Sequence, residues 1–327
     1  MYIIRAMKIS FIATVLNEQE NIGKLLRSVF SQSHEADEII IVDGGSTDNT
    51  VSEISSFKFP ESDSKAKIKL IFKKGNRSVG RNAAIESSNN EIIVCSDAGC
   101  VLDSDWIKNI IKPFKKKDVD VVAGYCKGNA KTVFQKCLIP YVLVMPDRVN
   151  TDNFLPATRS MAFKKLIWKK AGGFPEKFSN NEDYVFAKKL KEINAKIVFE
   201  KKAIVYWESR DSMKDAFVMF YRFAKGDAES SIFRPKVSLI FLRYIVGLIM
   251  LFIYLLSKSY FIFNALCLIL FIYVLWSIIK NYKYIRKVEA FLFLPLLQIV
   301  SDIAVILGTI RGLFTFINNM RRRLNGI

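Results

Sequence analysis

Carboxylate side chains recur in this sequence at places suited to binding and reacting with a charged ligand. The three groups are Val42-Asp43-Gly44-Gly45-Ser46-Thr47-Asp48, Ser96-Asp97-Ala98-Gly99 and Asn181-Glu182-Asp183. Carboxylates can take a proton from a hydroxyl group or, together with substrate phosphates, hold Mg²⁺ or Mn²⁺. Long apolar runs follow from about Val237. This order indicates an enzyme that acts on a charged soluble donor and a membrane-bound acceptor.

The first two groups follow segments that have the pattern of buried strands. Short runs rich in Ile and Val predict strands at residues 8–15, 38–42, 67–72, 91–96 and 119–125. Helical patterns lie between them, at residues 21–31, 48–57, 78–87 and 105–114. This alternation predicts an α/β fold with a mostly parallel sheet and helices on both faces. Ligands of such sheets bind beyond the carboxyl ends of the strands, where we expect Asp43 and Asp97.

Residues 126–235 have a less regular pattern. Residues 164–171 predict a short helix closed by Gly172-Gly173, and residues 183–193 predict a second helix beside Glu182. Residues 213–225 have the spacing of an amphipathic helix, with Met213, Phe217, Phe220, Tyr221 and Ala224 on one side. Such a helix either packs on its own domain or lies at a membrane surface.

The C-terminal region has the composition of a membrane domain. Residues 237–256 and 260–279 are each about long enough to span the ~30 Å hydrocarbon layer. Only Ser257-Lys258-Ser259 separates them, which predicts a helical hairpin. The basic loop at residues 280–287 is cytoplasmic by the positive-inside rule. We therefore expect a cytoplasmic catalytic domain at residues 1–235, a membrane region at residues 236–327, and a multi-pass protein of the inner membrane.

The third apolar segment, residues 289–316, allows two topologies. It contains Pro295, Gln298 and Asp302 and precedes Arg321-Arg322-Arg323. A full crossing would place those arginines outside, against the positive-inside rule, whereas a re-entrant or interfacial helix keeps them inside. The second topology is favoured. Asp302 is then either a functional carboxylate inside an apolar segment or a residue at the interface.

Charge and cysteine content exclude several classes of function. The net charge is +18, which suits anionic lipid or phosphorylated substrates. Nucleic acid is not expected as a partner, because the lysines are scattered and no nucleic-acid-binding signature is present. The five cysteines form no Cys-x-x-Cys pair and there is one histidine, so neither a disulfide framework nor a zinc site is expected. Residues 1–6 are too short for a signal peptide.

Six short motifs, in this order along about residues 7–230, resemble those of family 2 glycosyltransferases, the large inverting class with a GT-A fold. They are Thr14-Val15-Leu16-Asn17-Glu18, Val42-Asp43-Gly44-Gly45-Ser46-Thr47-Asp48, Gly80-Arg81-Asn82, Asp97-Ala98-Gly99, Gly172-Gly173-Phe174 and Glu182-Asp183. The resemblance implies a nucleotide-diphospho-sugar donor and a lipid or lipid-linked acceptor. The processive signature Gln-x-x-Arg-Trp is absent, which implies transfer of single sugars. The oligomeric state stays open.

The resemblance also implies roles for individual residues. Thr14, Glu18 and Asp43 would bind the nucleoside, and a guanidinium at Arg81 suits diphosphate oxygens. Asp97 would contact Mg²⁺ or Mn²⁺. These residues otherwise have ordinary structural interpretations, such as a surface arginine.

The third acidic motif would supply the catalytic base. Asp183 would take the acceptor proton, and Glu182 would orient it or contact the acceptor; without the resemblance, both acids would be read as stabilising a helix N-terminus. Arg210, which follows Trp207 where many family members have a histidine ligand, could reach a phosphate.

Two departures from the family pattern keep other functions open. Gly99 stands where the common Asp-x-Asp pattern has its second aspartate, which argues against strong metal binding without nucleotide. A nucleotidyltransferase of sugar phosphates could use a similar sheet, although the sequence after Val15 lacks its Lys- and Gly-rich loop. A catalytically inactive membrane scaffold is the non-enzymatic alternative, opposed by the intact Asp43, Arg81, Asp97 and Asp183.

Overall fold

The computed structural model describes residues 7–58 and 67–324, with side chains as far as residue 321. The prediction that residues 1–6 are no signal peptide lies outside the described residues, as do the side chains of Arg322 and Arg323. The chain divides into two compact units, one of Met1–Asn129 with Val144–Glu208 and one of Ala130–Leu143 with Ser209–Ile327. The domain boundary at residue 235 stays a prediction. The compact units divide the chain earlier, because two helices before residue 235 pack on the last helix.

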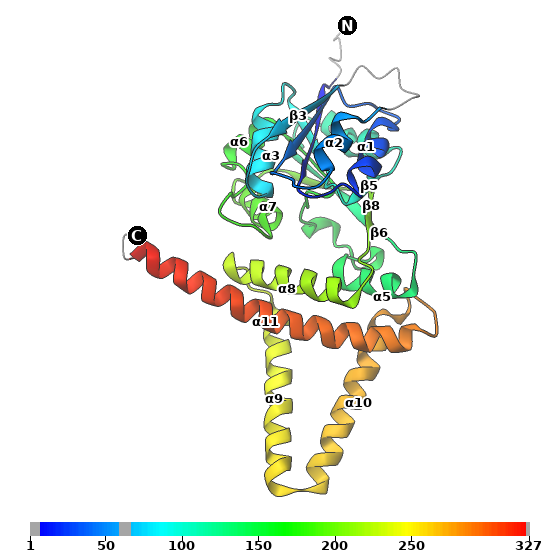
Figure 1. Cartoon of the computed structure of the whole chain (residues 1–327), viewed down its shortest axis with the longest axis vertical. Coiled ribbons are helices and arrows are strands. Elements are labelled where there is room, and N and C mark those ends of the chain that lie inside the picture. Colours follow the sequence, from blue (N-terminus) through cyan, green and yellow to red (C-terminus); the bar gives the residue numbers. More distant parts are fainter. Residues whose placement is uncertain (1–6, 59–66, 325–327) are drawn as a thin grey trace. The chain divides into compact units, whose positions relative to one another are not determined.

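The first unit contains an eight-stranded sheet in the order β3-β2-β1-β4-β7-β6-β8-β5. Figure 1 shows the sheet with helices such as α1, α2 and α3 beside it. The strands are β1 (Ile9–Val15), β2 (Glu38–Asp43), β3 (Ile68–Phe72), β4 (Ile92–Cys95), β5 (Cys100–Leu102), β6 (Val121–Asn129), β7 (Met161–Lys164) and β8 (Ile197–Glu208). Strands β1 to β4 pair parallel, as does β6 with β8, whereas β7 and β5 pair antiparallel. The predicted mostly parallel sheet is confirmed. The predicted strand ranges did not include β5, β7 or β8. Strands β5 and β7 have too few residues to show a clear alternating pattern.

The helices of the first unit lie where the sequence predicts them. They are α1 (Ile22–Phe30), α2 (Thr50–Ser55), α3 (Arg77–Glu86), α4 (Trp106–Ile111), α6 (Lys165–Lys170) and α7 (Glu182–Glu192). Short 3-10 helices occur at Lys112–Lys115, Pro146–Arg148 and Thr151–Asn153. Gly172 and Gly173 both have a φ of +71°, the left-handed conformation expected just after a helix end.

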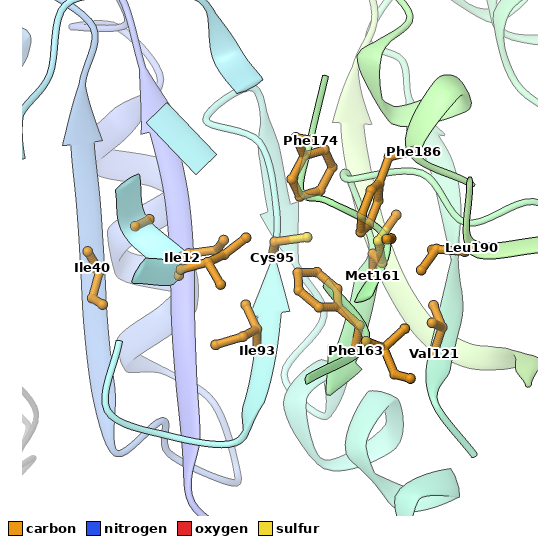
Figure 2. Close-up of a cluster of buried hydrophobic side chains, with 14 of the residues drawn as sticks. Ile12, Ile40, Ile93, Cys95, Val121, Met161, Phe163, Phe174, Phe186 and Leu190 are labelled. Carbon is orange, nitrogen blue, oxygen red and sulfur yellow. The ribbon is translucent and has the colours of Figure 1, made fainter. Parts of the chain in front are cut away.

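Helices cover both faces of the sheet, as the alternating pattern predicts. Successive side chains on a strand point to opposite faces. Ile12 belongs to a core cluster with residues of α3 and α7, shown in Figure 2, in which the tilted rings of Phe174 and Phe186 have centroids 4.0 Å apart. Its neighbour Phe11 instead meets Trp106 of α4, with ring centroids 6.3 Å apart. The two faces therefore hold separate apolar layers that fix the sheet edge on which the acids stand.

The second unit is helical. Its elements are α5 (Val133–Val142), α8 (Met213–Glu229), α9 (Pro235–Ser257), α10 (Tyr260–Tyr282) and α11 (Ala290–Leu324). Helices α9 and α10 form the predicted hairpin, and α11 runs across it along α8 (Figure 1). Helices α9, α10 and α11 are each long and apolar enough to cross a membrane. The buried face of α8 packs on α11, a partner that neither expectation for residues 213–225 had named.

Asp302 is part of a buried polar cluster that joins the three longest helices. Its side chain on α11 is 1% exposed and pairs with Arg243 of α9. The Tyr273 hydroxyl of α10 donates to Asp302 at 2.8 Å, and the Gln298 amide donates to it at the same distance. A carboxylate in apolar surroundings requires such partners. The cluster accounts for Asp302 as a residue that ties α9, α10 and α11 together.

Close packing of α8 on α11 depends on two glycines, which leads to a stability prediction. A Cβ added at Gly308 would collide with the Tyr221 carbonyl oxygen, and one added at Gly312 would lie 2.7 Å from the Ala228 Cβ. We expect Gly312→Leu to destabilise the chain by about 1–3 kcal/mol, because the helices must separate. The denaturation midpoint of the full chain in detergent measures this. Gly247→Leu on α9 is the matched control, since a Cβ at Gly247 meets nothing within 4 Å. Equal midpoints for the two variants would contradict the packing argument.

Candidate active site

Parallel pairing brings the first two acidic groups to the same edge of the sheet. β2 and β4 both pair parallel with β1, with Val15 opposite Asp43 and Ile12 opposite Cys95. Asp43 is the last residue of β2, and Asp97 follows β4 after one intervening residue. Both carboxylates therefore lie at the carboxyl edge, as the strand pattern predicts.

The Asp43 carboxylate is held by its own loop. Its side chain is buried, and Oδ2 accepts the backbone N–H groups of Gly45 at 2.9 Å and Ser46 at 3.0 Å. These bonds fold the glycine-containing loop back onto the end of β2. A carboxylate has about four lone-pair sites, so a further donor from a ligand can still be accepted. Binding of a nucleoside base by Asp43 stays a prediction.

The loop after β1 is joined to the loop after β2. The Thr47 N–H donates to the Asn17 side chain at 2.9 Å, and the Glu18 N–H donates to Thr50 Oγ1 at 2.7 Å. Thr14, which is partly buried, is the second-last residue of β1 and comes just before this junction. Thr14 and Glu18 thus lie beside the Asp43 loop, where a nucleoside would be expected. That role also stays a prediction.

Arg81 connects two of the acidic groups. Its guanidinium donates from Nη1 to Glu182 Oε1 at 2.6 Å and from Nη2 to Asp97 Oδ1 at 2.8 Å. The side chain is 2% exposed, and its Cζ lies 5.6 Å from the centre of the Phe174 ring. Burial lowers the pKa of Arg81, but the charges of Asp97 and Glu182 outweigh burial and raise it. Arg81 is therefore a permanent cation that holds the two carboxylates together.

A close approach of α3 to the sheet makes this geometry possible. A Cβ at Gly80 would lie 2.7 Å from the Thr14 methyl carbon, so glycine is required there for α3 to reach β1. Arg81 follows directly and is directed at the end of β4. The sequence pattern predicted an arginine that binds diphosphate. The structure instead gives Arg81 two internal carboxylate partners, and diphosphate contact stays a prediction.

Asp183 stands at the first turn of α7, next to Glu182. One of its oxygens accepts the Tyr184 N–H at 2.8 Å. Burial and then the Glu182 charge raise the pKa of Asp183 above its ordinary value of 3.8, against smaller opposing effects of Arg81 and Arg159. A carboxylate with a raised pKa is a stronger base than one free in water. The helix N-terminus also favours an acid here, so structural and catalytic interpretations hold together.

The side chains of the described residues do not by themselves make a complete metal site. Among the described residues, no group of three or more His, Cys, Asp or Glu side chains could hold a metal ion. Asp97 is already bonded to Arg81, Gly99 brings no carboxylate, and Trp207 stands where many family members have a histidine. Burial raises the pKa of Asp97, but Arg81, Arg77 and Arg159 lower it below its usual range. Asp97 is therefore ionised and could share an ion only with substrate phosphates.

Two cations near Asp97 were not found from the sequence. Arg77 begins α3, and Arg159 lies in the turn before β7. Neither has a sequence signal of its own, since each is one basic residue among many. Arg210, by contrast, was predicted to reach a phosphate, and it is an exposed residue of the second unit. Its role stays a prediction.

Comparison with known proteins decides the family. Residues 10–139 match the family model described as glycosyl transferase family 2. This part of the chain belongs to that family. The matched region holds the β1 to β4 edge with Asp43, Arg81 and Asp97, and the sheet with its flanking helices has the GT-A arrangement.

Curated relatives and a solved structure agree with this assignment. The chain is 26% identical over 252 residues to poly-beta-1,6-N-acetyl-D-glucosamine synthase of Staphylococcus epidermidis, covering 72% of this chain and 60% of the relative. It is 24% identical to glycosyltransferase AglE of Haloferax volcanii, covering 58% of this chain and 64% of that one. The fold resembles that of a mannosyltransferase of Pyrobaculum calidifontis in complex with GDP-Man and Mn²⁺, with a TM-score of 0.53, 18% identity and coverage of 68% and 62%. The chain thus spans less than two thirds of the relatives' lengths.

Proposed function

We propose that this chain is an inverting glycosyltransferase that moves a single sugar from a nucleotide-diphospho-sugar to a hydroxyl group of a lipid, a lipid-linked saccharide or a cell-surface glycan precursor. The observation that carries the proposal is the buried Arg81 bridge, which brings Asp97 and Glu182 together at the carboxyl edge of the sheet. Asp183 stands next to Glu182. Asp97, the acid proposed to lie near the nucleotide, and Asp183, the proposed base with a raised pKa, then belong to one site.

The chemistry follows from these positions. Asp183 accepts the proton of the acceptor hydroxyl, whose oxygen attacks the anomeric carbon of the donor sugar. The bond from that carbon to the diphosphate oxygen breaks, and the nucleoside diphosphate leaves with the bonding electron pair. Attack from the face opposite the leaving group inverts the anomeric carbon. Glu182, fixed by Arg81, keeps the start of α7 in place and so positions the base.

The donor carries negative charge that the site must balance. The nucleoside would lie beside Thr14, Glu18 and Asp43, with the diphosphate toward Asp97. Mg²⁺ or Mn²⁺ would be held by Asp97 and the donor's phosphates, and would neutralise the leaving group. Asp97 is the carboxylate that we propose as the protein's ligand for the ion. Because the other ligands come from the donor's phosphates, we expect the ion and the donor to bind together.

The apolar helices support a membrane-bound acceptor. Helices α9 and α10 would cross the inner membrane, with the basic loop after α10 and the catalytic unit in the cytoplasm. We place α11 along the membrane surface, because it runs across the hairpin beside α8 (Figure 1). The amphipathic acceptor would then reach the site from the lipid phase.

A donor screen tests the proposed function. The purified full chain is incubated with UDP-, GDP- and dTDP-sugars and with Mg²⁺ or Mn²⁺, and hydrolysis and thermal shift are recorded. Activity with one nucleotide sugar is expected. Turnover of a sugar phosphate with a nucleoside triphosphate would favour a nucleotidyltransferase, and no binding of any donor would favour an inactive scaffold.

Product length tests the transfer of single sugars. The related synthase has a name that denotes a polymer, so chain extension is the specific alternative. With one acceptor and excess donor, a single added sugar is expected by mass spectrometry. A ladder of products would show that this chain polymerises.

Asp97→Ala should weaken donor binding that depends on the divalent ion. The variant loses the proposed ligand and leaves Arg81 with one carboxylate partner. Removing a charge-assisted contact to substrate should reduce affinity about 10-fold to 100-fold. Calorimetric titration of the donor with and without Mn²⁺ measures this. Asp152→Ala, at an exposed position, is the control, and an equal Mn²⁺ response in both variants would remove Asp97 from the metal assignment.

A further inference from the structure

Arg159 is the feature of the site that the proposed function leaves unused. Its backbone and side chain are anchored at two separate points. The Ser96 hydroxyl donates to the Arg159 carbonyl oxygen at 2.8 Å, which fixes the backbone beside the end of β4. The guanidinium carbon lies 5.5 Å from the centre of the Trp207 ring. Trp207 on β8 pairs with Cys100 on β5.

These two anchors place Arg159 along the segment that carries Asp97. Residues 97–99 connect Ser96 to Cys100, so a side chain that begins beside Ser96 and ends over Trp207 runs next to them. A Cβ added at Gly99 would meet nothing within 4 Å, so there is open space beside this segment. This open space lies at Gly99, where the common family pattern has its second aspartate.

The Arg159 guanidinium lies close enough to Asp97 to lower the pKa of that carboxyl, but it makes no salt bridge among the described residues. Across residues 7–58 and 67–324, the salt bridges of Asp97 and Glu182 are made with Arg81, and Arg159 takes part in none. Trp207, in contrast, is buried and offers the guanidinium an aromatic face. A guanidinium stacked on an aromatic ring is held in orientation while its N–H donors stay available. Such a cation next to an open space suits a phosphate group.

We propose that Arg159, held on Trp207, binds a phosphate group in the space beside Gly99. This proposal rests on the proposed function for the source of the phosphate, which is the donor diphosphate or the phosphate of a lipid acceptor. A fixed guanidinium would then supply positive charge where the family pattern uses a second carboxylate to hold a metal ion. Trp207 in place of a histidine fits the same exchange, because it supports the arginine rather than an ion.

The test compares Arg159→Gln, Arg159→Lys and the control Arg27→Gln, an exposed arginine of α1. Full-length protein in lipid nanodiscs with Mg²⁺ is titrated with UDP, GDP, their nucleosides, inorganic pyrophosphate and a polyisoprenyl phosphate. Arg159→Gln should weaken phosphate binding about 10-fold to 100-fold and leave nucleoside binding unchanged. Arg159→Lys should retain part of the affinity, which guards against a simple folding defect. Thermal unfolding without ligand is recorded for each variant.

Comparing the affinities for the different phosphate ligands identifies the source of the phosphate. Weaker binding of UDP or GDP assigns Arg159 to the donor, and weaker binding of polyisoprenyl phosphate alone assigns it to the acceptor. If the wild type binds pyrophosphate but no nucleotide, the proposed function fails and the phosphate site stands. If Arg159→Gln binds every phosphate ligand as tightly as Arg27→Gln does, or if the wild type binds none, the proposal is overturned.

Discussion

Replacing Asp183 with asparagine should abolish sugar transfer and leave donor binding intact. The amide cannot accept the acceptor proton, and loss of a general base typically costs about 100-fold to 10,000-fold in rate. The side chain keeps its size and can still accept the Tyr184 N–H that Asp183 accepts at 2.8 Å. Turnover with saturating donor and acceptor measures the loss, and calorimetric titration of the donor measures retained binding.

Glu192→Gln provides the matched control for Asp183→Asn. It makes the same carboxylate-to-amide change at the exposed end of the same helix, α7. Normal turnover is expected for this control. If Asp183→Asn retained the wild-type rate, another group would have to be the base.

The pH dependence of activity should report the same group. The pKa of Asp183 is raised above 3.8, so the base is ionised and active only at pH values above that raised pKa. We expect kcat/KM to fall as the pH decreases through it. If the slow Asp183→Asn variant still showed the same fall of kcat/KM at low pH, that fall would report the titration of a different residue.

Asp183→Asn should also raise stability at neutral pH. A carboxyl whose pKa is raised on folding binds its proton more tightly in the folded state than in the unfolded state. Its ionised form therefore destabilises the fold, and stability increases as pH falls through the folded pKa. The variant removes this penalty, so its thermal midpoint should exceed the wild type at pH 7 and approach it in acid. A lower midpoint at pH 7 would contradict the assigned direction.

Replacing Arg81 with methionine should destabilise the chain strongly. The change leaves the Glu182 carboxylate, whose side chain is 4% exposed, without the guanidinium that it contacts at 2.6 Å. Breaking a buried ion pair by removing one partner costs about 3–5 kcal/mol. The denaturation midpoint of the full chain in detergent measures the effect.

Two further variants separate the buried charge from other effects of Arg81→Met. Adding Glu182→Gln removes the stranded charge, so the double variant should recover part of the lost stability. Lys196→Met breaks the exposed ion pair with Asp118 and should leave the midpoint almost unchanged. If the double variant were as unstable as the sum of its single changes, Arg81 would not be acting through Glu182.

The strands, helices and first two acids were predictable because their signals are local. Short apolar runs at β1, β2 and β4 and the helices between them determine a parallel sheet. In such a sheet, Asp43 and Asp97 must come to one edge, since parallel strands end on the same side. The hairpin of α9 and α10 was predictable for a similar reason, because its length and composition are set by the membrane.

The contacts of Arg81 and Arg159 could not be predicted from local pattern. Arg81 meets Glu182 across 101 positions of sequence, and no periodicity encodes such a pairing. Arg159 has no signal at all until β8 brings Trp207 beside it. In the second unit, the packing of α11 on α8 through Gly312 could not be predicted either. In an apolar run, a glycine indicates only a residue of low helix propensity.

The sequence by itself determined which residue types stand at the ends of which strands, and which segments are apolar enough for a membrane. These properties depend on neighbours within a few positions. Only the tertiary structure decided which charges neutralise one another and which cation is left beside open space. Those outcomes depend on distances between side chains that are remote in sequence, and folding alone brings them within reach of a hydrogen bond.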